Sequence, residues 1–147
     1  MADNVALVRG LYEAWNDRNF DLEADAMAPD ATVMMVGTGD VFEGPDGSRR
    51  YNEGWVRGFP DGKITVDKTV AEGDSVVVEY TGRGTHTGTL DTSTGAIPAT
   101  GRSVTLKLCD VLELSHTICP FGKPASLGVT QMHLMVDAYV RRSGVHD

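Results

Sequence analysis

The chain contains 147 residues, which at roughly 100 to 200 residues per domain predicts a single domain spanning residues 1–147. Its 13 Lys and Arg residues and 21 Asp and Glu residues give a formal net charge of −8, which disfavours nucleic acid and anionic membranes as partners. Hydrophobic residues make up 41% of the chain and charged residues 23%, as in a globular domain that can enclose a small pocket.

The N-terminal residues Met1 to Val5 lack the basic and apolar stretches of a signal peptide. No apolar run approaches the roughly 20 residues that a membrane span needs. The two cysteines, Cys109 and Cys119, form no Cys-x-x-Cys motif, which favours structural thiols in a reducing compartment over a disulfide framework. We therefore expect a soluble, cytoplasmic protein.

Two helices are predicted near the N-terminus. The first begins at a capping residue, Asp3 or Asn4, and ends within residues 16–19. Its apolar residues at helical spacing are Val5, Val8, Leu11, Tyr12 and Trp15. The second begins at the cap candidate Asp21 and stops before Pro29, which disfavours helix in the preceding residue. Its predicted inner face consists of Leu22, Ala26 and Met27.

The remaining elements in chain order are a strand over 31–36, a turn at 44–47 and a third helix over 48–57. From Lys63 onward the apolar residues alternate with polar ones, and 75–81 is rich in residues that favour strands. Helices followed by antiparallel strands predict an α+β fold, a curved sheet covered on one face by helices. The glycines of 82–88 interrupt a strand and predict a bulge or a close backbone approach.

Asp110 is the one polar residue in an otherwise apolar row on the strand predicted over 102–114. The row consists of Val104, Leu106, Leu108, Asp110, Leu112 and Leu114. A carboxylate without a partner in such surroundings costs several kcal/mol or keeps its proton. Asp110 therefore indicates a polar partner, a structural hydrogen bond or chemistry.

Asp137 is the predicted partner of Asp110. A second strand is predicted over about 129–140, with one face formed by Gln131, His133, Met135, Asp137 and Tyr139. If the hairpin folds symmetrically about Lys123 and Pro124, Asp110 lies opposite Asp137, with Cβ atoms about 4.5 to 5.5 Å apart. One carboxyl of such a pair has a raised pKa, as a general acid or base needs. The alternative is that either Asp accepts structural hydrogen bonds from backbone, Tyr or Trp donors.

Several segments together resemble the SnoaL-like polyketide cyclase family, which has the nuclear-transport-factor-two-like cone fold. They are Tyr12-Glu13-Ala14-Trp15-Asn16, Gly44-Pro45-Asp46-Gly47, Phe59-Pro60-Asp61, Ala71 to Val76, Gly84 to Gly88 with Ile97 to Arg102, and Val136 to Val145. The resemblance implies three helices on a strongly curved mixed or antiparallel sheet, an apolar cavity without a cofactor, and a homodimer.

The resemblance also implies roles for single residues. Asp137 falls where the family's cyclases have the general acid/base of an intramolecular aldol closure. Family cyclases can carry a His where this chain has Asp110, so its acid/base pairing can differ from theirs. A longer loop, 115–127, replaces the family's usual short hairpin and is a candidate lid, dimer contact or plain solvent loop.

The other candidate site residues are a histidine near the cavity mouth and several residues expected to line the pocket. His86 is expected to orient the substrate or to satisfy the glycine-rich segment structurally. Candidate substrate-binding residues are Tyr12, Trp15, Trp55, His133, Met135 and Tyr139. Because no motif has metal-ligand spacing, we predict no metal site.

The sequence thus predicts a small cofactor-independent enzyme that moves protons on a hydrophobic carbonyl compound, by aldol cyclisation or isomerisation. Asp137 would be the acid/base, Asp110 its tuning partner or second acid, and His86 a positioning residue. Epoxide hydrolysis by the paired Asp residues is one alternative, and a non-catalytic protein that binds a hydrophobic small molecule is another.

Overall fold

The computed structural model describes residues 4–36, 38–93, 95–117 and 126–137, and side chains as far as Leu114. The helices are α1 (Asn4–Asn16), α2 (Phe20–Asp25) and α3 (Gly44–Gly58). The strands are β1 (Met27–Met35), β2 (Asp40–Glu43), β3 (Lys63–Glu72), β4 (Ser75–Thr85), β5 (Leu90–Thr92), β6 (Gly95–Ile97), β7 (Ser103–Thr117) and β8 (Ser126–Asp137).

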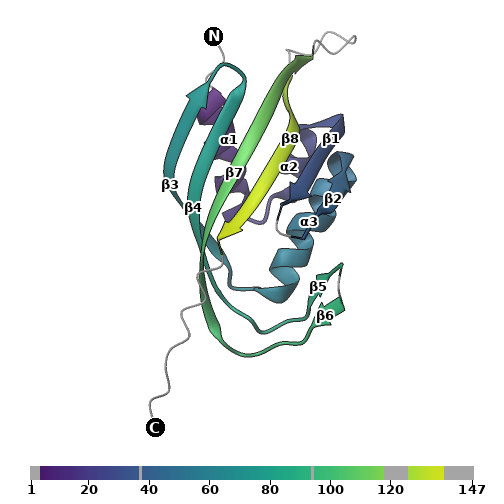
Figure 1. Cartoon of the computed structure of the whole chain (residues 1–147), viewed down its shortest axis with the longest axis vertical. Helices are drawn as coiled ribbons and strands as arrows, with labels where there is room; N and C mark the ends of the chain where they lie inside the picture. Colours follow the sequence, from purple (N-terminus) through teal and green to yellow (C-terminus); the bar gives the residue numbers. More distant parts are fainter. Residues whose placement is uncertain (1–3, 37, 94, 118–125, 138–147) are drawn as a thin grey trace.

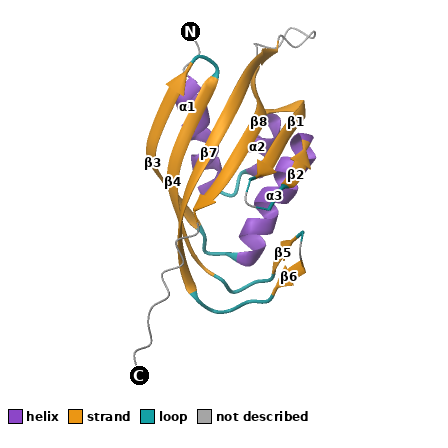
Figure 2. Ribbon diagram, viewed as in Figure 1, coloured by secondary structure: helices purple, strands orange, loops and turns teal. Residues whose placement is uncertain are grey.

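The described strands form one large mixed sheet in the order β2-β1-β8-β7-β4-β3, with β5 and β6 as a separate hairpin. β1 and β8 run parallel and the other neighbours antiparallel. The three helices cover one face of the sheet, and the β5–β6 hairpin lies beside the end of α3 (Figures 1 and 2). This confirms the predicted α+β cone with helices from the first half of the chain.

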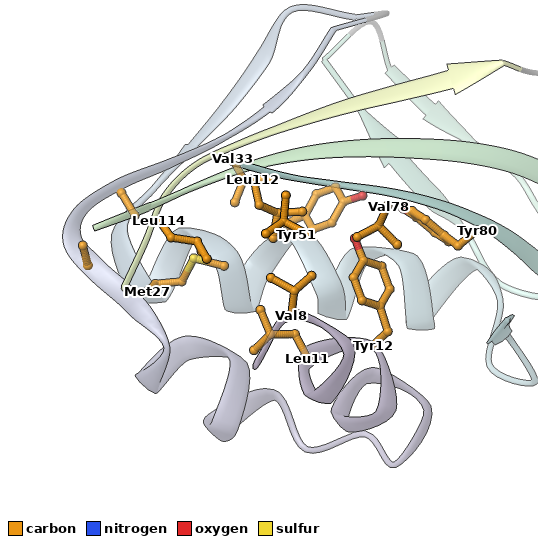
Figure 3. Packing of buried hydrophobic residues seen from close by; sticks show 13 residues of the cluster. Val8, Leu11, Tyr12, Met27, Val33, Tyr51, Val78, Tyr80, Leu112 and Leu114 are labelled. Atoms are coloured by element: carbon orange, nitrogen blue, oxygen red, sulfur yellow. The ribbon is translucent and has the colours of Figure 1, made fainter. Parts of the chain in front are cut away.

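The core lies between this sheet face and the helices. In Figure 3, Val8, Leu11 and Tyr12 of α1 point towards the strands that carry Val33, Val78 and Leu112. The buried cluster consists of Val8, Leu11, Tyr12, Met27, Ala28, Ala31, Val33, Tyr51, Val76, Val78, Tyr80, Leu112 and Leu114. The predicted apolar row of β7 faces inward, and it includes Asp110.

Two predictions are wrong: the turn at 44–47 and the start of the first strand at residue 31. The segment 44–47 is the first turn of α3, where Pro45 fits because the first helical positions need no N–H donor. β1 begins at Met27, so Pro29 lies inside a strand. Pairing with β8 is irregular between Met27 and Thr32, and a proline costs no ladder hydrogen bond in such a gap.

The glycine-rich segment does not contain the predicted bulge, but the predicted close approach is present. Gly82 and Gly84 pair regularly with β7 as part of β4. A Cβ atom on Gly88 would lie 1.8 Å from the carbonyl oxygen of Arg57, and one on Gly84 would lie 3.2 Å from Phe59 Cβ. These glycines therefore let β4 and the following chain pass close to the end of α3.

Within the described residues, no helix combines the length and the apolar character that crossing a bilayer requires. Cys109 is a free, half-buried thiol, and Cys119 lies outside the described residues.

Candidate active site

A cavity of about 100 Å³ lies between the helices and the inner face of the sheet. Its wall is mostly apolar, and the predicted substrate-binding residues Tyr12, Trp15 and Trp55 all belong to it. The polar side chains in the wall include Tyr12, Glu23, Ser48, Asn52, Tyr80 and Asp110. An apolar pocket with a few polar groups is typical of a small-molecule site.

Asp110 is the most deeply buried of these polar residues, with a relative exposure of 0%. Tyr12 of α1 donates a hydrogen bond of 2.6 Å to its Oδ2, and Tyr80 of β4 donates one of 3.2 Å to its Oδ1. These hydrogen bonds confirm the alternative in which Asp110 accepts from Tyr donors, and its described partners are two tyrosines in place of the predicted Asp137. Of these, Tyr80 could have been anticipated, because it alternates with the inward-facing Val76 and Val78.

Burial raises the pKa of Asp110 from its ordinary value of 3.8 to about 8, although both tyrosine hydrogen bonds act in the lowering direction. The ion pairs found in the described chain, Arg49–Asp21, Arg57–Asp91 and Lys107–Asp67, do not include Asp110. The neutral acid therefore outnumbers the carboxylate by about ten to one at pH 7. Asp110 can donate a hydrogen bond or a proton into the cavity.

The phenols beside Asp110 stay protonated. Burial, followed by the charge of Asp110, raises the pKa values of Tyr12 and Tyr80 well above 10.0. The centroids of their rings lie 5.1 Å apart in a tilted arrangement, and both hydroxyl groups reach the carboxyl of Asp110. Both tyrosines thus position Asp110 as hydrogen-bond donors.

Glu23 is a second buried carboxyl in the same wall, and the sequence did not reveal it. It lies on α2 with a relative exposure of 6%, and Asn52 Nδ2 of α3 donates a hydrogen bond to its Oε2. Burial raises the pKa of Glu23 to about 8. The predicted inner face of α2 is wrong at Leu22, which is 46% exposed. Ala26 and Met27 face the core as predicted but follow the helix, which ends at Asp25.

The predicted pairing of Asp110 with Asp137 is wrong. The register places Leu134 opposite Asp110 and Lys107 opposite Asp137. β7 extends to Thr117, which pairs with Ser126 at the start of β8, and a ladder irregularity between Glu113 and Leu114 moves the register by one residue. The hairpin is therefore not symmetric about Lys123 and Pro124.

The predicted face assignment of β8 changes with the register. His133 and Met135 pair with Val111 and Cys109 rather than with inward-facing positions of β7. The side chains of His133, Met135 and Asp137 lie outside the described ones, as does Tyr139 entirely. Their predicted roles, including the acid/base role of Asp137, stay predictions.

His86 lies behind the cavity wall rather than in it. Its ring stacks on Phe59 with centroids 5.2 Å apart, and its Nδ1 lies 3.1 Å from Thr100 Oγ1. Phe59 belongs to the cavity wall and itself stacks on Trp55. The predicted contact between His86 and a substrate therefore stays a prediction.

Among the described residues, no group of three or more His, Cys, Asp and Glu side chains converges as metal ligands do. The cavity instead offers two protonatable carboxyls, three partner side chains that hold them, and apolar surface for a hydrophobic ligand. This combination suits proton transfer.

The sequence profile of SnoaL-like polyketide cyclases matches residues 5–116. Among curated proteins, no sequence matches this chain at a significant level.

Solved structures share the fold. A candidate SnoaL-like polyketide cyclase from Jannaschia sp. CCS1 is 23% identical, with a TM-score of 0.73 over 91% of this chain and 85% of that one. IdmH, a candidate polyketide cyclase from Streptomyces antibioticus, is 22% identical, with a TM-score of 0.68 over 92% and 93%. AclR, a candidate hydroxylase from Streptomyces galilaeus, is 21% identical, with a TM-score of 0.68 over 93% and 90%.

Proposed function

The chain belongs to the SnoaL-like polyketide cyclase family, and on that premise we propose that it catalyses proton transfer on a hydrophobic carbonyl compound without a cofactor. The reaction would be an aldol cyclisation or a double-bond isomerisation. The observation that carries the proposal is Asp110, a fully buried carboxyl that two tyrosines hold at the cavity wall.

The chemistry follows from the protonation state of Asp110. Removing a proton from the carbon beside a carbonyl group moves negative charge onto the carbonyl oxygen. A carboxylic acid kept neutral by an apolar site can donate a hydrogen bond to that oxygen as the charge develops. Tyr12 and Tyr80 occupy both oxygens of Asp110 as donors, so its own proton is the one available to a ligand.

The epoxide hydrolase alternative loses its main support, because it relied on pairing between Asp110 and Asp137. The alternative of a non-catalytic binding protein uses the same apolar cavity, so only a catalytic measurement separates it from the proposed enzyme. AclR is a candidate hydroxylase and IdmH a candidate polyketide cyclase. A shared fold therefore does not by itself determine the reaction.

The test is the exchange of α-hydrogens in 2-tetralone, a small apolar ketone, followed by NMR in deuterated water. The wild-type protein should accelerate the exchange, and Asp110→Asn should lower the rate about a hundredfold or more, as for loss of a donor to the developing oxyanion. Glu53→Gln, a change at an exposed position of α3, is the matched control and should leave the rate unchanged. Wild-type binding of 2-tetralone without exchange would favour the binding protein.

A further inference from the structure

The hydrogen bond from Asp110 to a carbonyl oxygen leaves the removal of the carbon-bound proton unassigned. Asp137 is not opposite Asp110 in the β7–β8 ladder. The cavity wall contains another carboxyl, that of Glu23 on α2, which the chemistry described so far does not use.

Glu23 is held from one side by α3. Asn52 Nδ2 donates to its Oε2, and Asn52 is itself buried in the cavity wall with a relative exposure of 5%. An amide donor supports a carboxylate and fixes its orientation without supplying a compensating positive charge. With its pKa at about 8, about a tenth of Glu23 is ionised at pH 7, and that carboxylate is a stronger base than an exposed one.

Glu23 and Asp110 both line the cavity between the helices and the sheet. They come from different walls, the helical layer and the sheet, and both border the one cavity. The charges of both carboxyls act on the buried hydroxyl groups of Tyr12 and Tyr51. A small ligand whose oxygen reaches Asp110 can therefore place its neighbouring carbons towards the helical wall that carries Glu23.

A purely structural link between α2 and α3 does not need an acid at this position. A buried carboxyl without a cationic partner is costly, whereas a neutral amide could accept the same hydrogen bond from Asn52. No described ion pair includes Glu23. A carboxyl that can ionise at the wall of a cavity instead supplies the base that proton abstraction from an apolar ligand requires.

We propose that Glu23, positioned by Asn52, is the general base that removes the proton from the carbon next to the substrate's carbonyl group. The proposal rests on the proposed function, in which Asp110 binds the carbonyl oxygen. It assigns the substrate as a ketone with a hydrogen on its α-carbon.

The step balances without a redox partner. Glu23 takes the proton, the C–H electron pair becomes the C=C bond of the enolate, and the C=O π pair moves to oxygen beside Asp110. In isomerisation, Glu23 returns the proton to another carbon of the conjugated system. In cyclisation, the enolate carbon bonds to a second carbonyl carbon and Asp110 gives its proton to the new alkoxide. Exchange with water then restores both carboxyls.

Two measurements test the assignment separately from the proposed function. Exchange of 2-tetralone hydrogens reports proton removal, and binding of 2-naphthol, whose hydroxyl imitates the enol oxygen, reports the contact with Asp110. Glu23→Gln should lower the exchange rate at least a hundredfold and change 2-naphthol affinity less than about threefold. Asp110→Asn should instead weaken 2-naphthol binding about tenfold.

The outcomes distinguish the two claims. Exchange that survives Glu23→Gln, while 2-naphthol binding still depends on Asp110, overturns the role of Glu23 and leaves the proposed function in place. Wild-type protein that neither binds 2-naphthol nor exchanges 2-tetralone contradicts both. Glu23→Asp should restore part of the exchange, because a shorter carboxylate can still accept the proton.

A measurement on the wild-type protein covers the case in which the variants do not fold. With 13C-labelled Glu, the carboxyl signal of Glu23 should titrate near pH 8 and shift when 2-naphthol occupies the cavity. A Glu23 carboxyl that titrates near its ordinary value of 4.5, or whose signal does not shift when 2-naphthol binds, would overturn the assignment.

Discussion

Replacing Asp110 with Asn should remove a specific part of the pH dependence of stability. Because the folded-state pKa of Asp110 is raised from 3.8 to about 8, the native state holds this proton more tightly than the unfolded state does. The stabilisation from protonated Asp110 is complete below pH 3.8 and is lost as the pH rises towards 8. Asn cannot ionise, so the stability of the variant does not fall with rising pH on account of this position.

The magnitude follows from the linkage between proton binding and folding. Within that window the wild-type free energy of unfolding falls by about 1.4 kcal/mol for each pH unit on account of Asp110. Between about pH 5.5 and about pH 7.5, the difference in free energy of unfolding between wild type and Asp110→Asn should change by about 2.5 kcal/mol, in favour of the variant. The contributions of titrating groups whose pKa values the substitution leaves unchanged cancel in this comparison.

Urea unfolding of both proteins at the two pH values measures this difference. The expected change exceeds the usual extrapolation error of about 10 to 15% for a domain of this size. If the difference between wild type and variant is the same at both pH values, Asp110 is ionised in the folded protein. That result would refute both the raised pKa and the donor role that depends on it.

Three further changes test other parts of the structure. Tyr12→Phe removes the 2.6 Å donor that lowers the pKa of Asp110, so that pKa should rise further, as read by 13C NMR titration; a fall would contradict the hydrogen bond. Asp137→Asn should slow 2-tetralone exchange far less than Asp110→Asn, and equal losses in the two variants would restore the acid/base role that the sequence predicts. Gly88→Ala should destabilise the protein by roughly 3 kcal/mol or more in thermal unfolding, because its Cβ would lie 1.8 Å from a carbonyl oxygen of α3. Gly54→Ala, with open space around the added Cβ, is its control and should be neutral or stabilising by up to about 1 kcal/mol.

The pattern of single strands and helices was predictable where burial is periodic. The inward row of β7 and the apolar stripe of α1 follow directly from spacings of two and of three to four residues. Asp110 stood out for the same reason, because a polar residue in an apolar row needs a partner. The identity of that partner depended on which elements meet in space, and α1 lies far from β7 in the sequence.

The register of β7 and β8 was not predictable, because the sequence that joins the two strands carries no short hairpin-turn motif such as Asn-Gly or Asp-Gly. Glu23 was missed for a different reason. An acidic residue in a short helix is typical of a solvent-facing position, whereas in α2 Glu23 is buried and its neighbour Leu22 is exposed. Local sequence thus identified one carboxyl of the cavity, and tertiary packing supplied the other.

The position of β8 in the sheet has a consequence for how the protein is assembled. β8 lies between β1 and β7, so within the described sheet it is the sole connection between the β2–β1 pair and the β7–β4–β3 group. It is also the last described strand to leave the ribosome. Both groups must therefore wait with an unpaired strand edge until β8 arrives, and such edges favour aggregation. Completion of the sheet is therefore governed by the slow pairing of segments that lie far apart in the sequence.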